Sequence, residues 1–168
     1  LASPNSLHAA VMMLAILAVA VIGWRDDHAS VSIRVRLGIH LLAATATAAV
    51  LGAPESLLQT LSGLGIVWLA LPLTVLVLTW AINLFNFMDG LDGLAASETI
   101  FISLAAAYLG DPGSPALPAL LILASASGGF LLFNWPPARI FMGDVGSGAI
   151  GLTLAALLLA LHLWGQLS

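Results

Sequence analysis

The sequence has 168 residues, of which 61% are hydrophobic and only 7% are charged, and its mean hydropathy is +1.10. Soluble domains carry about 25% charged residues, so this composition excludes a water-solvated domain and indicates a chain that lies largely in a bilayer. The net charge is −4, with no lysine, four arginines and no cysteine, so we expect no nucleic-acid partner, no disulfide framework and no thiolate metal site.

Six apolar runs are long enough to be considered as membrane-spanning helices, which need roughly 17–25 residues. The fourth of them is the shortest and contains Glu98. Turn residues rich in proline and glycine follow the second, fourth and fifth runs. We therefore expect an all-α fold, a polytopic transmembrane helix bundle with about six membrane-spanning helices, at 7–24, 37–53, 64–82, 94–109, 117–134 and 148–165.

The charged residues gather in three loops, 25–36, 83–93 and 135–147, which six crossings would place on one side of the membrane. All four arginines lie in these loops and none lies in the loops at 54–63 or 110–116. This bias predicts that the three loops face the cytoplasm. Five of the eight acids lie in the same loops: Asp26, Asp27, Asp89, Asp92 and Asp144.

The first loop contains the adjacent acids Asp26 and Asp27, followed by His28. Adjacent carboxylates repel each other by roughly 1–4 kcal/mol, and such pairs persist where a cation neutralises them or where one of them holds a proton. A solvated loop that carries two acids without a function is the alternative. The four histidines of the chain are scattered and predict no metal site.

In the second loop, an amide, an amide, an acid and an acid recur at every third position. Residues three apart are neighbours on a helix, so this spacing predicts a polar ladder at the membrane edge, in which Gly90 and Gly93 let the backbone approach a ligand. A capping and turn element is the alternative interpretation. The ladder consists of Asn83, Asn86, Asp89 and Asp92.

The third loop ends in Asp144, Gly146, Ser147 and Gly148, directly before the sixth predicted helix. A glycine-rich turn into a helix N-terminus favours phosphate. Asp144 suits a Mg²⁺ ion that bridges to such a phosphate, and Arg139 could add a bidentate phosphate contact. The alternative is an aspartate N-cap with glycines that allow close packing.

Two long motifs, NLFNFMDGLDGLAA at 83–96 and FNWPPARIFMGDVGSG at 133–148, resemble the signature loops of the polyprenyl-phosphate N-acetylhexosamine-1-phosphate transferases. These enzymes make the first lipid intermediate of peptidoglycan or initiate O-antigen and teichoic acid synthesis. WRDDHASVSIRVRLGIHLLAA at 24–44 resembles the Asp-Asp loop of the family and the helix that follows it. The resemblance covers residues 8–165.

The resemblance implies a role for each acid of the three loops. Asp144 would ligate Mg²⁺, with Mn²⁺ as an alternative ion. Asp26 or Asp27 would deprotonate or orient the polyprenyl phosphate, and Asp89 would organise phosphates and metal. Together with the phosphate cradle read from the third motif, the expected substrate-binding residues are Asn83, Asn86, Asp92 (to uracil), Arg139, Phe141 (stacked on uracil), Gly146 and Ser147.

The implied reaction transfers a sugar-1-phosphate from a UDP-N-acetylhexosamine to a polyprenyl phosphate and releases UMP. The implied location is the bacterial plasma membrane, and a homodimer is expected as a possible assembly. The wording of the motifs is closer to the O-antigen-initiating branch than to the peptidoglycan branch. Members of the family usually carry more than six helices, so residues 1–168 are expected to be one catalytic core segment that lacks N-terminal and C-terminal helices. The alternatives are a membrane transporter and an inactive fragment of such an enzyme.

Overall fold

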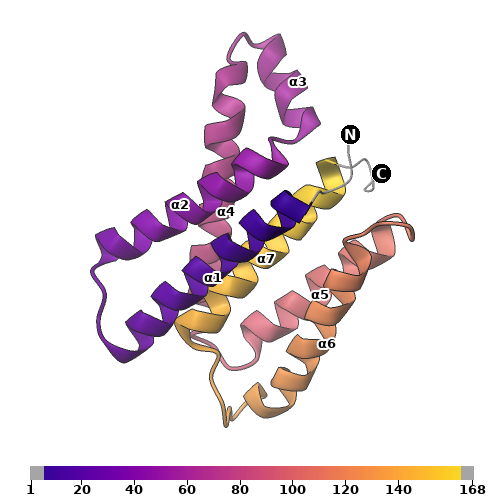
Figure 1. Ribbon diagram of the computed structural model, residues 1–168. Coiled ribbons are helices and arrows are strands. Elements are labelled where there is room, and N and C mark those ends of the chain that lie inside the picture. The colour runs from indigo at the N-terminus through magenta and orange to yellow at the C-terminus, as the bar shows by residue number, and fades with distance from the viewer. Residues whose placement is uncertain (1–5, 164–168) are drawn as a thin grey trace.

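The computed structural model describes residues 6–163, and its elements are helices that run back and forth along one another (Figure 1). Five segments are long and apolar enough to cross a membrane, and α5, with 16 residues, is a shorter apolar helix. The expected all-α, polytopic bundle is thereby confirmed. In chain order the elements are α1 (Ser6–His28), α2 (Ile33–Leu51), α3 (Glu55–Gly63), the 3₁₀ helix η1 (Val67–Leu69), α4 (Ala70–Met88), α5 (Leu94–Leu109), α6 (Leu117–Asn134) and α7 (Gly143–Leu163).

Helix α7 is the central helix of the bundle and packs between α1 and α4. Half of its membrane-spanning window is buried, against 17–28% in the other four spanning segments. Glycines make this close packing possible, since a Cβ atom on Gly151 would lie 2.6 Å from the carbonyl oxygen of Ala81, and one on Gly148 would lie 3.0 Å from Val19. Small residues at such contacts let helix backbones approach closely in a membrane.

Helices α5 and α6 form a hairpin that packs mainly within itself and touches the rest of the bundle over few residues. Figure 1 shows this hairpin beside the group formed by α1, α2, α4 and α7. Because the long helices alternate in direction, the end of α1, the start of α2, the end of α4 and the start of α7 meet at one end of the bundle. The polar residues singled out in the sequence lie at this end.

Two of the predicted spans, 94–109 and 117–134, agree with α5 and α6 residue by residue. The other spans extend further than predicted toward the polar end: α1 continues to His28, α2 begins at Ile33, α4 continues to Met88 and α7 begins at Gly143. The last two residues of the sixth predicted span lie outside the described residues.

These extensions change where the polar residues lie. Asp26 and Asp27 belong to the last turns of α1 and are not in a loop. Asn83 and Asn86 belong to α4, as the ladder read from their spacing predicts, whereas Asp89 and Asp92 follow the helix. The glycine-rich segment was expected to be a turn before the sixth helix. This is also wrong, because Asp144 and Ser147 stand in the first two turns of α7. The loop at 54–63 contains a helix, α3, that the sequence reading did not predict.

Candidate active site

Asp144, in the first turn of α7, is joined through its carboxylate to two other helices. Its Oδ1 accepts a hydrogen bond from Nδ2 of Asn86 at 2.6 Å, and its Oδ2 accepts one from Nη1 of Arg36 at 2.9 Å. The same amide of Asn86 lies 3.3 Å from Oγ of Ser147, one turn further along α7. The start of α7 is therefore tied to α2 and α4 by polar contacts at the end of the bundle.

Arg36 contacts a second carboxylate, that of Asp26 in the last turns of α1. The same Nη1 atom binds Oδ2 of Asp26, while Oδ1 of Asp26 accepts a hydrogen bond from the backbone amide of Val31 at 2.7 Å. The side chains of Arg36, Asp26 and Asp144 are 29%, 15% and 28% exposed, respectively. Arg36 thus supplies one positive charge that two partly buried carboxylates share.

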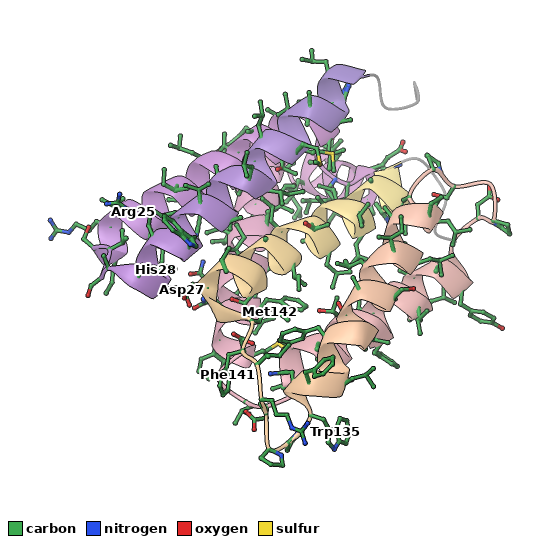
Figure 2. The ribbon with its side chains drawn as sticks, turned by 60° about the horizontal axis from the view of Figure 1, so that its bottom comes forward. Arg25, Asp27, His28, Trp135, Phe141 and Met142 are labelled. Carbon is green, nitrogen blue, oxygen red and sulfur yellow. The ribbon has the colours of Figure 1, made fainter. Side chains whose placement is uncertain are left out.

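Asp27 caps the N-terminus of α7 from the end of another helix. Its Oδ1 accepts a hydrogen bond from the backbone amide of Asp144 at 2.9 Å and its Oδ2 one from that of Val145 at 3.2 Å. Such N–H groups have no partner within their own helix, and a carboxylate is favoured beside them. Figure 2 shows Asp27 at the end of α1, next to the chain segment that leads into α7.

Glycines at two positions allow this contact between α1 and α7. Gly143 has a φ of +67°, which side chains disfavour, and a Cβ atom there would lie 2.7 Å from the carboxylate of Asp27. A Cβ atom on Gly23, in α1, would lie 2.4 Å from the carbonyl oxygen of Asp144. Both backbones therefore have to lack a side chain for Asp27 to reach the first turn of α7.

Asp89, which directly follows α4, has a pKa raised to about 6. Burial is the main cause, and the nearby carboxylates of Asp144 and Asp27 raise the pKa further, while a hydrogen bond with the backbone of Gly143 lowers it. A carboxyl group with such a pKa can take up and release a proton close to neutral pH, as a general acid or base must.

A second polar contact fixes the loop between α6 and α7 against the turn between α4 and α5. Asn134, which is buried, accepts a hydrogen bond from the backbone amide of Gly93 and donates one to the carbonyl oxygen of Ile140, both at 2.9 Å. The carboxylate of Asp92 accepts a hydrogen bond from the backbone amide of Ala138, also at 2.9 Å. The two connections at this end of the bundle are thus linked to each other.

Four residues were assigned to catalysis or to the metal, and hydrogen bonds join three of them: Asp26, Asp27 and Asp144. Direct hydrogen bonds, or hydrogen bonds through Arg36, connect residues that stand on four different helices, and Asp89 interacts electrostatically with two members of the group. We call this group the acidic cluster; it consists of Asp26, Asp27, Arg36, Asn86, Asp144 and Ser147.

The remaining predicted site residues lie outside the acidic cluster. Nδ2 of Asn83 donates to the carbonyl oxygen of Thr79 at 2.7 Å. Arg139 and Phe141 have exposed side chains on the loop after α6, and Phe141 is 72% exposed. Figure 2 shows Phe141 on the segment that leads into α7 and Trp135 on the outermost part of this loop.

Gly146 lies inside α7 instead of in a phosphate-binding turn, and a Cβ atom there would lie 2.4 Å from Cγ of Met142. The two amides at the start of α7 that could have faced a phosphate are bonded to Asp27. The expectation that these N–H groups are free is therefore wrong, because both donate hydrogen bonds to the carboxylate of Asp27.

Two residues of the site were missed by the sequence reading. Arg36 entered it only as a positive charge at the membrane edge, although it joins Asp26 to Asp144, which is 108 residues further along the chain. Asn134 stood within a quoted motif without a role. Its position at the predicted end of a helix, two residues before Pro136, was a signal for a side chain that bonds to backbone groups of a turn.

The oxygen donors at this end of the bundle are of the kind that hard divalent cations prefer. Mg²⁺ is commonly bound by one or two carboxylates, with substrate phosphates and water as its other ligands. Within residues 6–163 no preformed group of three acidic or histidine side chains is arranged as a metal cage. The donor set is chemically suited to such a cation, and Asp144 is the carboxylate that contacts both Asn86 and Arg36.

Comparison with known proteins shows which family the chain resembles along most of its length. The family described as Glycosyl transferase family 4 matches residues 9–162. The chain is 35% identical over 165 residues to a phospho-N-acetylmuramoyl-pentapeptide-transferase of Heliobacterium modesticaldum, covering 89% of this chain and 51% of the relative. It is 38% identical over 170 residues to an enzyme of the same name from a Synechococcus strain, covering 90% of this chain and 47% of the relative.

A third relative carries a different name. It is a probable undecaprenyl-phosphate N-acetylglucosaminyl 1-phosphate transferase of Bacillus subtilis, 41% identical over 93 residues, which are 54% of this chain and 26% of the relative. The chain spans about half the length of the relatives that it matches over most of its own residues.

Proposed function

The chain belongs to glycosyl transferase family 4, and we propose that its protein transfers a sugar-1-phosphate from a UDP-N-acetylhexosamine to a polyprenyl phosphate. The observation that carries this proposal is the acidic cluster, in which carboxylates from α1 and α7 share one arginine at the end of a membrane-spanning bundle. A diphosphate substrate with its cation needs carboxylates, and a lipid phosphate needs a site at the membrane surface. This end of the bundle supplies both.

The reaction, as we write it, exchanges one P–O bond for another. An oxygen of the polyprenyl phosphate attacks the phosphorus that carries the sugar, and the bond between that phosphorus and the oxygen of UMP breaks. The products are polyprenyl-diphospho-sugar and UMP. Mg²⁺, when bound, neutralises charge on the diphosphate and on the leaving UMP.

Several polar residues at this end of the bundle have a part in this scheme. Asp144, held by Asn86, binds the cation of the diphosphate. Asp26 shares Arg36 with Asp144, so the guanidinium can turn to a substrate phosphate when a cation takes its place beside the carboxylates. Asp89, with its pKa near 6, can hold or release the proton of the acceptor phosphate.

The other predicted contacts complete the substrate site in this proposal. Asp92 and Phe141 bind the uracil, and Arg139 and Asn83 bind phosphates. The exposed Phe141 and Arg139 lie on a loop that Asn134 fixes at its base, so the loop can present them to a nucleotide from outside the bundle. We place this end at the cytoplasmic face, on the side to which the positive-inside rule assigns the arginines.

The position of the cluster favours a transferase over a transporter. Transporters place their ion and substrate sites near the middle of the bilayer, at broken helices. Here the carboxylates lie in the last turns of α1 and the first turn of α7. These are helix ends, where water-soluble UDP-sugars can reach them.

The test is UMP release by the full-length protein in detergent, given polyprenyl phosphate, Mg²⁺ and a panel of UDP-N-acetylhexosamines. We expect release to require the lipid, the cation and Asp144, and Asp144→Asn to abolish it without loss of folded protein. Undiminished release by Asp144→Asn would refute the assignment of the cation. Lack of release with every sugar, from protein shown to be folded, would refute the proposed reaction.

A further inference from the structure

Thr79, on α4, differs from the other helical threonines in the described part of the chain. A helical threonine can donate its hydroxyl to the carbonyl oxygen one turn earlier in its own helix. Thr79 does not, and its Oγ1 atom is buried without a hydrogen-bond partner among residues 6–163. The threonines that do make this bond, at 2.7–2.9 Å, are Thr45, Thr47, Thr60, Thr74, Thr99 and Thr153.

His40, on α2, shows the same feature from the other side of the contact between α2 and α4. Its side chain is 5% exposed, and its Nδ1 atom is buried without a partner within the described residues. Its ring interacts with the side chain of Asn83 and with the charge of Arg36. Since His40 stands one helical turn after Arg36, both project from the same face of α2.

The Asn83 side chain interacts with both residues that carry these unpaired atoms. Its Nδ2 donates to the carbonyl oxygen of Thr79, one turn earlier on α4, while its side chain also interacts with His40. A buried polar atom without a partner costs about 1–3 kcal/mol. Three side chains among the described residues carry such an atom, and the third is Ser103, on α5. The other two belong to residues that interact with one carboxamide, that of Asn83, and this pairing indicates a functional use.

We propose that His40 and Thr79 are positioning residues for the transfer reaction. They hold the Asn83 carboxamide toward the substrate phosphates, directly and through one bridging water molecule bound by Nδ1 of His40 and Oγ1 of Thr79. A buried water of this kind typically joins polar groups that lack other partners. The inference rests on the proposed function, because it assigns the two residues to a substrate contact of the same site.

The first test compares two identical substitutions on one helix. Thr79→Val removes the unpaired hydroxyl, and Thr74→Val removes a buried hydroxyl that is already bonded to Ala70. Both are made in the full-length protein, with UMP release and thermal unfolding in detergent as readouts. We expect Thr79→Val to lower kcat at least about tenfold, as loss of supporting contacts around a site does, without lowering the unfolding midpoint. Thr74→Val should keep kcat within about twofold of the parent.

The second test uses His40→Leu and His40→Gln. We expect His40→Leu to lower kcat about 10–100-fold with little change in the KM of the UDP-sugar, because uracil and sugar contacts are untouched. His40→Gln, which keeps a hydrogen-bonding group, should recover most of that loss. Should His40→Leu not fold, the two threonine variants still decide the question.

Equal turnover by Thr79→Val and the parent would overturn the inference. So would a fall of kcat in Thr79→Val that is matched by Thr74→Val, or a loss in His40→Leu that His40→Gln does not relieve. Failure of the proposed function is distinguished by the parent protein, which would then release no UMP from any sugar tested. Activity in the parent with unchanged variants refutes only the positioning role.

Discussion

Replacement of Arg36 by glutamine would leave the carboxylates of Asp26 and Asp144 facing each other without a counter-charge. In the structure a single nitrogen atom, Nη1, contacts both. Two contacts to one atom place the carboxylate oxygens within about 5 Å of each other, and the two carboxyl groups also interact directly. We therefore expect Arg36→Gln to destabilise the end of the bundle by direct repulsion, and we expect a divalent cation to restore the stability.

The size of the effect follows from that separation. Across about 4–5 Å two unit charges repel by about 1 kcal/mol at a dielectric constant of 80, and by about 3–4 kcal/mol at 20. The three side chains are 15–29% exposed, so the local dielectric lies between these limits. The predicted loss of stability is about 1–4 kcal/mol, more than an exposed ion pair contributes.

The assay is thermal unfolding of the full-length protein in detergent, with and without Mg²⁺. Arg34→Gln is the matched control, because Arg34 stands on the same helix, is exposed and makes no ion pair with any described residue. We expect a lower midpoint for Arg36→Gln than for Arg34→Gln, and a larger upward shift of that midpoint with Mg²⁺ than in the parent. Equal midpoints of the two variants without cation would refute the reasoning.

Three further predictions concern the contacts around the cluster. Gly143→Ala should destabilise the protein by about 1–3 kcal/mol because of its positive φ and its approach to Asp27, whereas Gly38→Ala, with open space around it, should not; equal unfolding midpoints would contradict this. Asn134→Ala should speed hydrogen exchange of the loop after α6, and unchanged exchange would exclude Asn134 as its anchor. The pKa of Asp89 is raised from 3.8 to about 6, so the folded protein favours the protonated carboxyl group. The stability that this proton contributes is fully present below the pKa of an unfolded aspartate and is lost as the pH rises through about 6. Asp89→Asn should therefore gain stability relative to the parent between pH 4.5 and pH 7.5, and a constant difference would refute that shift.

The sequence predicted the membrane class, the helix order and the sidedness of the charges because these depend on local composition. The spans 94–109 and 117–134 were predicted to the residue, since Gly93, Gly110 and Pro136 interrupt the apolar runs there. At the polar end of the bundle, α1 and α4 were predicted to end too early and α2 and α7 to begin too late, because polar residues at a membrane edge were read as loop. Their helical state depends on partners in distant helices, which no local pattern reveals.

The candidate site shows the same division between local and distant information. Asp27 was recognised as an acid of interest, but its contact with the first turn of α7 joins residues 117 positions apart. Arg36 was missed for the same reason, since the sequence around an arginine does not indicate whether it pairs with a carboxylate on another helix. Helix α3 was missed because a nine-residue helix is too short for the length criterion that identified the spans.

The capping of α7 by Asp27 has a consequence for biogenesis. The acids of α1 and the arginine of α2 leave the ribosome more than a hundred residues before Asp144 does. Until α7 is inserted, α1 and α2 lie in the membrane with Asp27 lacking its partner amides and with Arg36 bound to one carboxylate alone. The acidic cluster is thus completed only when α7 is inserted, and a nascent chain that stops before Gly143 lacks the carboxylate and the backbone amides that α7 contributes to it.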